Sequence, residues 1–390
     1  MKANIFIICF AIIVSGCQSS PSSLHGSTIE PPLLDEKFPG YQNFYVESED
    51  EIFALDDDMK LMVAEKLTPE QNIKRRALKL LKFIFNSENI SLTYARNANV
   101  TARQAFHNQQ ANCLSLTILA YSLAKEANLA VSFQQINTPE YWVRNGRYNF
   151  LTGHVNLLVK QKQDHGKSYN FGSDGFQIDF DPLASKSTFK RAVIDKEIVL
   201  AMFYNNKGAQ ALVEKNYAKA YHYFKTSVDV APYFSQTWGN LGVLYKLTNQ
   251  IEEAELTYRY AVDLNDKNLT ALENLSILLF QEQNFEEATT IKDKLQTIRR
   301  KNPYYYALLA DDAFYSGNNA TALLYYKKAI KLDRNVHEFY FGLAKVYSKM
   351  NEIRLAQESI ERAILHNNSR GTNRLYTAKL NYLKDAAIEN

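Results

Sequence analysis

The segment SQTWGNLGVLYKLTNQIEEAELTYRYAVDLNDKN, residues 235–268, determines how the C-terminal half of this chain folds. Its first half carries apolar residues at helical spacing, including Trp238 and Leu241, and its second half does the same with Ala254 and Tyr258. Apolar residues three and four positions apart predict two amphipathic helices joined by a short turn. One such pair leaves an apolar face exposed, so we expect neighbouring pairs to stack against it.

The same pattern recurs every 34 residues, with repeats starting at 201, 235, 269, 303 and 337. Two helices approach closely only where the facing residues are small, and large residues then fill the space on either side. Small residues recur at the eighth and twentieth positions of the repeats: Gly208, Gly242, Ser276, Ala310 and Ala344, and Ala220, Ala254, Ala288, Ala322 and Ala356. We therefore predict five helix pairs over residues 199–368 and a capping helix over 369–390.

These repeats resemble the tetratricopeptide repeat (TPR), and residues 235–268 lie nearest to its consensus. The resemblance implies an all-α superhelical solenoid whose first helices line a concave groove for a protein or peptide partner. By position, the groove would carry Leu212, Val243, Ile277, Phe280, Tyr304 and Phe314. The sequence leaves open whether each of these side chains faces a groove or the core between repeats.

The N-terminus has the layout of a secretory signal. Lys2 precedes the apolar run 3–13, which is too short to cross a bilayer that needs about 20 helical residues. Val14-Ser15-Gly16-Cys17 follows and resembles the bacterial lipobox. The resemblance implies that residues 1–16 are a lipoprotein signal peptide and that Cys17 receives acyl chains such as palmitate, which anchor the protein in a membrane. The alternative is an ordinary signal peptide with a cysteine there by chance.

Two further features extend the prediction of an envelope lipoprotein. Gln18 rather than aspartate follows Cys17, which favours the outer membrane if the source bacterium has two membranes. Residues 17–50 are predicted to be a flexible tether, because 18–40 is rich in serine, proline and glycine. With Cys9 in the signal peptide and Cys17 lipidated, Cys113 is the sole thiol of the mature chain.

The composition restricts the possible functions. Apolar residues make up 46% of the 390 residues and charged residues 22%, as in a globular protein, and the formal net charge is only +3. So small a charge does not favour nucleic acid as a partner. Neither metal-ligand spacing nor a phosphate-binding glycine loop occurs, so we predict no metal and no cofactor.

Residues 51–198 precede the repeats and contain one cysteine in an unusual setting. Asn112 is a suitable N-cap, and residues 113–124 are nearly all apolar or small, which predicts a buried helix with Cys113 in its first turn. The positive end of the helix dipole favours a thiolate there. His154 begins a strand-like segment, and Asp179 lies in another, at 176–181. A cysteine nucleophile, a histidine base and an orienting carboxylate are the three groups that a thiol triad requires.

Over residues 60–195, the sequence resembles the transglutaminase-like, papain-like cysteine fold. The short motifs that carry this resemblance are Asn112-Cys113-Leu114-Ser115-Leu116, Gly153-His154-Val155-Asn156 and Ile178-Asp179-Phe180. The resemblance implies an α+β domain in which Cys113 is the nucleophile, His154 the general base and acid, and Asp179 the orienting carboxylate. Asp181 is the alternative to Asp179, because Asp181-Pro182 also matches the family's Asp-Pro ending of the strand. Val155-Asn156 stands where the family has an aromatic residue.

Two functions follow for the whole chain. In the first, an envelope lipoprotein uses a Cys–His–Asp site for acyl transfer or amide hydrolysis, and its repeats bind the protein partner or substrate. In the second, the transglutaminase-like fold is catalytically inactive and serves, with the repeats, as a membrane-tethered scaffold for protein–protein interaction.

Overall fold

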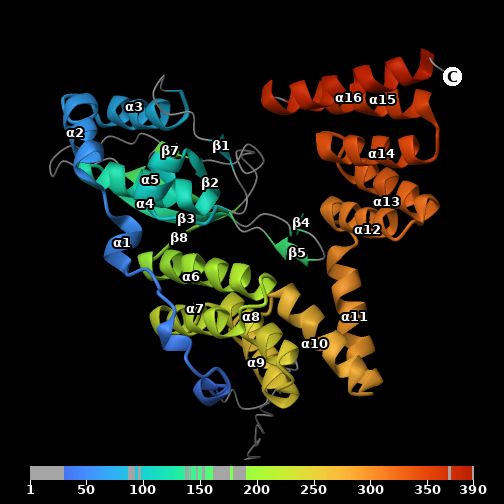
Figure 1. The fold of residues 1–390 in the computed structure, drawn as a ribbon, viewed down its shortest axis with the longest axis horizontal. Helices are drawn as coiled ribbons and strands as arrows, with labels where there is room; N and C mark the ends of the chain where they lie inside the picture. Colours follow the sequence, from blue (N-terminus) through green and yellow to red (C-terminus); the bar gives the residue numbers. More distant parts are fainter. Residues whose placement is uncertain are drawn as a thin grey trace, which may run out of the picture.

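The computed structural model describes residues 30–86, 93–94, 98–136, 140, 142–145, 148–151, 154–160, 176–178, 190–367 and 370–388. The described chain is mostly helical (Figure 1). A part that contains a small sheet is followed by a long array of helix pairs, which curves from α6 beneath the sheet to α16 on the other side of the molecule (Figure 1).

The sheet-containing part has a central antiparallel sheet in the order β7-β6-β3-β8. Its strands are β3 (Ala130–Ile136), β6 (His154–Lys160), β7 (Phe176–Ile178) and β8 (Arg191–Ile194). Short strands pair elsewhere: β1 (Thr93–Tyr94) with β2 (Gln110–Ala111), and β4 (Trp142–Asn145) with β5 (Tyr148–Leu151) in a hairpin. The helices are α1 (Glu49–Phe53), α2 (Asp57–Lys66), α3 (Ile73–Asn86), α4 (Ala102–Asn108) and α5 (Cys113–Glu126).

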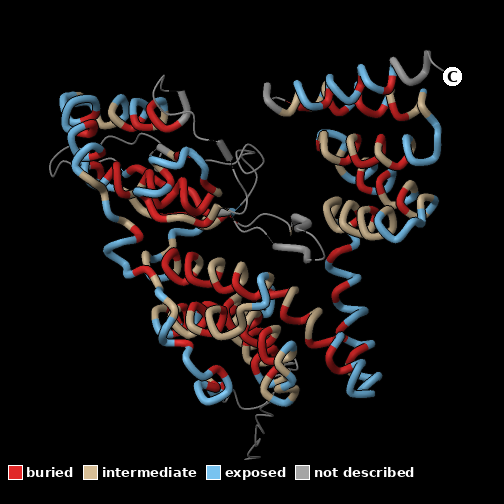
Figure 2. Tube along the Cα trace, in the orientation of Figure 1, coloured by how far each residue is buried: buried red, intermediate tan, exposed pale blue. Residues whose placement is uncertain are grey.

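Helix α5 is the centre of this part because its sequence is apolar on every side. Ile118 and Leu123 are fully buried. Alternate strand residues point to one face of a sheet, and here Phe133, Leu157 and Ile178 share a core with α5. Figure 2 shows α5 as an almost unbroken buried segment.

The repeats form helix pairs where the sequence places them. The first helices of successive pairs begin 34 residues apart, at 235, 269, 303 and 337. The helices are α6 (Lys196–Val213), α7 (Tyr217–Val230), α8 (Ser235–Leu247), α9 (Ile251–Leu264), α10 (Leu269–Gln281), α11 (Phe285–Arg299), α12 (Pro303–Tyr315), α13 (Asn319–Leu332), α14 (His337–Lys349), α15 (Ile353–His366) and α16 (Arg370–Ile388). Helix α16 buries Tyr376, Leu380 and Leu383 against the last pair, as a capping helix does.

The glycines at the eighth position of the first two repeats have the predicted steric role. A Cβ atom on Gly208 would lie 2.5 Å from the ring of Phe224, and one on Gly242 would lie 2.6 Å from the ring of Tyr258. Each aromatic ring from the second helix therefore lies directly on the backbone of the first helix, which only glycine permits at this distance.

The prediction of a flexible tether over 17–50 is wrong for residues 30–50. Residues 30–44, which we name the N-terminal clip, lie against the first helix pairs, and Phe38 stacks on Tyr221 with ring centroids 4.4 Å apart. Asp35 accepts hydrogen bonds from the Tyr221 hydroxyl (2.6 Å) and from Lys225 Nζ (2.8 Å). A few aromatic side chains thus hold a segment whose proline content is typical of a linker.

Burial alone would raise the pKa of Asp35, but hydrogen bonds from Lys225, Tyr221 and Tyr41 lower it below its ordinary value. The carboxylate is therefore the form that holds the clip in place.

Within the residues that the structure describes, no helix combines the length and the apolar character needed to span a bilayer.

Candidate functional site

Cys113 begins α5, as the sequence predicts, and its side chain is buried with 9% exposed. Asn112 Oδ1 accepts a hydrogen bond from the Ser115 backbone N–H at 2.9 Å, which is the N-cap that the sequence indicates. Ser115 Oγ accepts from the Val100 N–H at 2.8 Å and donates to the Ala98 carbonyl at 3.2 Å. These bonds hold the preceding segment firmly beside the first turn of the helix.

Thr117 connects this first turn to the central sheet. Its hydroxyl lies 2.8 Å from the carbonyl of Cys113 and 3.0 Å from the carbonyl of Val155. Val155 is the second residue of β6, and β6 begins at His154. The fold therefore brings the start of the histidine strand beside the start of the cysteine helix, although 41 positions separate Cys113 from His154 in the sequence.

The remaining parts of the predicted triad cannot be placed in the same way. Asp179 and Asp181 lie outside the described residues, as does the side chain of His154. Ile178, which directly precedes Asp179, pairs with Leu157 of β6. Cys17, the predicted lipidation site, also lies outside the described residues. Among the residues described, no group of three His, Cys, Asp or Glu side chains is arranged to hold a metal ion.

The predicted groove residues fall into two sets. The prediction that Leu212 lines the groove is wrong. Leu212 is 7% exposed and belongs to the core of the first repeats, so it does not line an accessible groove. Val243 is half-buried against the same core, Tyr304 packs on Phe339, and Phe314 lies beneath Lys345. Only two of the six are exposed.

Those two exposed side chains lie on α10, the first helix of the third pair. Ile277 is 46% exposed and Phe280 is 61% exposed, whereas their neighbours Leu278 and Leu279 are buried. The ring of Phe280 makes an edge contact with Phe285 of α11, at 5.1 Å between centroids. This apolar surface, which we name the α10 patch (Ile277, Phe280 and Phe285), is not required to fill the core.

Sequence reasoning missed one polar site altogether. Arg299, the last residue of α11, is only 2% exposed and forms ion pairs with Glu140 and with Glu273 of α10. Glu140 precedes the β4–β5 hairpin, which Figure 1 shows between the sheet-containing part and α12. One feature of the sequence indicates this site: the third repeat has an arginine where the other repeats have Ala231, Asn265, Asp333 and Asn367.

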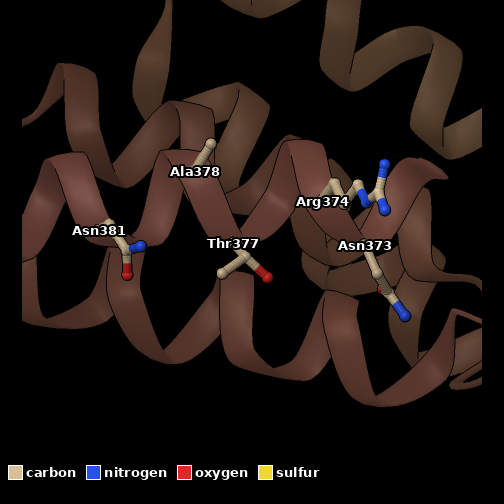
Figure 3. Close-up of a pocket in the computed structure, with 5 residues that line it drawn as sticks. All are labelled: Asn373, Arg374, Thr377, Ala378 and Asn381. Atoms are coloured by element: carbon tan, nitrogen blue, oxygen red, sulfur yellow. The ribbon is translucent and has the colours of Figure 1, made fainter. Parts of the chain in front are cut away.

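A shallow hollow runs along α16 (Figure 3). It is lined by Asn373, Arg374, Thr377, Ala378 and Asn381. All of these belong to one helix, so the hollow is a surface of the capping helix and brings no residues together from different elements.

Comparison with known proteins supports the repeat assignment. The family model described as tetratricopeptide repeat matches residues 235–268 and 337–366, so the chain contains tetratricopeptide repeats. The chain is similar to the protein O-mannosyl-transferase TMTC3 of mouse (28% identity) and of human (27%), in each case over 167 residues. These matches cover 39% of this chain and 18% of either relative, so the chain spans less than a fifth of the curated relatives it matches.

Two solved structures also resemble the chain. One is from the functional characterization of Pseudomonas aeruginosa pilF, with 18% identity over 50% of this chain and 90% of that chain and a TM-score of 0.29. The other is YrrB, a TPR protein with an unusual peptide-binding site, with 14% identity over 46% of this chain and 92% of that chain and a TM-score of 0.26.

Proposed function

We propose that this chain is an interaction protein whose tetratricopeptide solenoid binds a segment of a protein partner on the surface of its first helices. The observation that carries the proposal is the α10 patch, where Ile277 and Phe280 are exposed although Leu278 and Leu279 beside them fill the core. Stacked helix pairs of this kind form extended concave surfaces suited to binding other chains.

The energetics favour a partner with an apolar side chain at this point. Fully burying an exposed phenylalanine contributes about 1.5–3 kcal/mol, so burying the 61% of Phe280 that is exposed contributes about 1–2 kcal/mol. Aromatic residues in the centre of an interface commonly dominate its binding energy. Phe280, already in contact with Phe285, is therefore the residue of the α10 patch whose loss should weaken binding most.

The test compares two variants of the full chain. Ile277→Ser with Phe280→Ser removes the two α10 side chains of the α10 patch, and Leu324→Ser is the matched control, because Leu324 is 63% exposed on α13, a second helix. In quantitative affinity capture from the source cells, the double variant should lose the partner that the wild-type chain and Leu324→Ser retain. Equal recovery by all three chains, with unchanged circular dichroism, would refute the proposed surface.

The second candidate function is a thiol enzyme for acyl transfer or amide hydrolysis, with the repeats presenting its substrate. The observation that favours it is the Thr117 hydroxyl, which lies within 3.0 Å of the carbonyls of both Cys113 and Val155. The first of these bonds lies within α5 and the second crosses to β6, so the beginning of the cysteine helix lies beside the beginning of the histidine strand. The transglutaminase-like resemblance assigns Cys113 as nucleophile, His154 as base and Asp179, or alternatively Asp181, as the orienting carboxylate.

The rate of Cys113 alkylation by iodoacetamide separates this enzyme from an inactive scaffold. An activated thiolate should react faster at pH 7 than the same cysteine in urea-unfolded chain, and His154→Ala should abolish the difference. Asp179→Asn and Asp181→Asn then identify the carboxylate. If the folded chain reacts no faster than the unfolded one, the domain is a catalytically inactive part of a scaffold.

The sequence around Cys17 supports a lipid anchor at the bacterial envelope, in the outer membrane if there are two. Such an anchor would hold the solenoid beside a membrane, and the N-terminal clip is the described segment that follows it in the sequence. Metabolic labelling with an alkyne analogue of palmitate should mark the wild-type chain and the Cys113→Ser control but not Cys17→Ser. Labelling of all three chains would exclude Cys17 as the acylated residue.

A further inference from the structure

The third repeat contains a buried charge that the repeat architecture does not need. Arg299 occupies the thirty-first position of its repeat, where the other four have Ala231, Asn265, Asp333 and Asn367. Those repeats form the same helix pairs without an arginine, and their second helices end one residue earlier in the repeat. Arg299 nevertheless is 2% exposed, and burying a guanidinium is unfavourable unless its donors are satisfied.

The donors of Arg299 are satisfied largely by a segment from outside the repeats. Its Nε donates to Glu140 Oε2 at 2.7 Å and its Nη2 to Glu140 Oε1 at 3.0 Å, which is the two-point geometry that arginine forms with a carboxylate. Nη1 lies 3.0 Å from Glu273 of α10, and the ring of Tyr305 lies 5.5 Å from the guanidinium carbon. Burial alone would lower the pKa of Arg299, but these carboxylates raise it and keep the side chain charged.

Asn302 recognises the backbone of the same segment. Its Oδ1 caps α12 by accepting from the Tyr304 N–H at 3.0 Å, and its Nδ2 donates to the carbonyl of Glu140 at 2.8 Å. The equivalent Asn268 caps α10 in the same way, but its Nδ2 donates within the solenoid, to the carbonyl of Ser235 at 3.2 Å. In the third repeat, the side-chain amide of this cap residue therefore binds the Glu140 segment and not the preceding repeat.

Side-chain and main-chain recognition of one residue is how a protein binds an extended peptide. We propose that Arg299, Asn302 and Tyr305 form a binding site of the solenoid for a segment with an acidic side chain, that Glu140 of the same chain occupies this site, and that a partner protein presenting a glutamate or aspartate displaces it. We name these three residues the Arg299 site. The inference rests on the proposed function, since it supplies an acidic feature for the partner that the solenoid binds.

The occupant and its competitor are distinguished by charge. Glu140 is held at a high effective concentration because it belongs to the same chain, so a separate peptide competes poorly until Glu140 loses its charge. The probe is a fluorescein-labelled peptide of residues 137–151, NTPEYWVRNGRYNFL, and a second peptide with glutamine in place of its glutamate. Binding of both is measured by anisotropy on the full chain in detergent.

The expected result is that Glu140→Gln binds the glutamate peptide at least about tenfold more tightly than the wild-type chain does, and at least about tenfold more tightly than it binds the glutamine peptide. Glu282→Gln, which changes an exposed glutamate of the same solenoid, should behave as wild type. Equal binding of the two peptides to every chain, whether weak or tight, would overturn the proposal and leave Arg299–Glu140 as a structural ion pair only.

The comparison of the two peptides on the wild-type chain, at concentrations that overcome Glu140, gives the same test without altering the fold. The inference and the proposed function fail separately, because partner capture through the α10 patch is measured with variants that leave Arg299, Asn302 and Tyr305 unchanged.

Discussion

Replacing Gly242 by alanine tests whether the packing of an aromatic ring on a helix backbone holds the repeats together. A Cβ on Gly242 would lie 2.6 Å from both Cδ1 and Cε1 of Tyr258, where carbon atoms normally approach to about 3.5–4.0 Å. The ring would have to move by about 1 Å to restore that separation. Tyr258 is 1% exposed and packed in the core, so such a shift would disturb its neighbours.

The magnitude follows from two opposing contributions. Alanine stabilises a helix interior by about 0.8–1.0 kcal/mol relative to glycine. Overpacking a well-filled core costs about 1–3 kcal/mol. We therefore expect Gly242→Ala to leave the unfolding free energy nearly unchanged at best and to lower it by about 2 kcal/mol at worst.

Gly239 on the same helix is the matched control. A Cβ there would meet Ala271 Cβ at 3.5 Å and Asn268 Nδ2 at 3.6 Å, which are ordinary contacts. Gly239→Ala should therefore keep the whole helix-propensity gain of about 0.8–1.0 kcal/mol. The two alanine variants should differ by about 1–3 kcal/mol in urea unfolding followed by circular dichroism, with Gly242→Ala the less stable.

Trimming the ring completes the test. Adding Tyr258→Leu to Gly242→Ala should cost less than adding it to the wild-type chain, because the smaller side chain removes the clash. If Gly242→Ala is as stable as Gly239→Ala, or if the two changes at Gly242 and Tyr258 are additive, the steric account of the repeat is refuted.

Three further predictions concern the contacts that join the parts of the chain. Phe38→Ala should release the N-terminal clip, because the ring is 3% exposed and stacks on Tyr221, and limited proteolysis should then cleave within residues 30–44 well before the repeats; unchanged cleavage would contradict this. The same clip should dissociate in acid. The pKa of Asp35 is lowered from 3.8 in the folded chain. The contribution of Asp35 to the stability of the docked clip is therefore complete above pH 3.8 and is lost as the pH falls through the lowered pKa. Asp35→Asn should remove this pH dependence of clip proteolysis. Thr117→Val should lower the unfolding free energy by about 1–3 kcal/mol, because it removes the hydroxyl between two buried carbonyls, and Thr290→Val, on the exposed side of α11, should change it by less than about 0.5 kcal/mol.

The sequence predicted best those features that depend on neighbours in the chain. The helix pairs repeat every 34 residues, and Gly242 meets Tyr258 only sixteen positions away, so periodicity alone specifies the contact. The N-cap of α5 was predictable for the same reason, since Asn112 and Ser115 are three residues apart.

Features that depend on distant partners were missed or mistaken. Phe38 and Tyr221 are far apart in the sequence, and the proline and glycine that follow Phe38 are typical of a linker, so the sequence predicts a tether where the N-terminal clip lies. Arg299 and Glu140 are separated by 159 positions, and neither stands within a motif. The repeat position of Leu212 predicts a groove residue, whereas its side chain is buried in the core of the first repeats. The roles of Cys113, His154 and Asp179 or Asp181, and lipidation of Cys17, stay predictions.

The central claim is that the surface of the first helices binds a protein partner, and site-specific photo-crosslinking in the source cells tests it most directly. Benzoylphenylalanine in place of Phe280 should give a covalent adduct with the partner on irradiation, whereas the same residue in place of Leu324, equally exposed but on a second helix, should give none. An adduct at position 324 alone, or at neither position in a chain that still captures its partner, would contradict the claim.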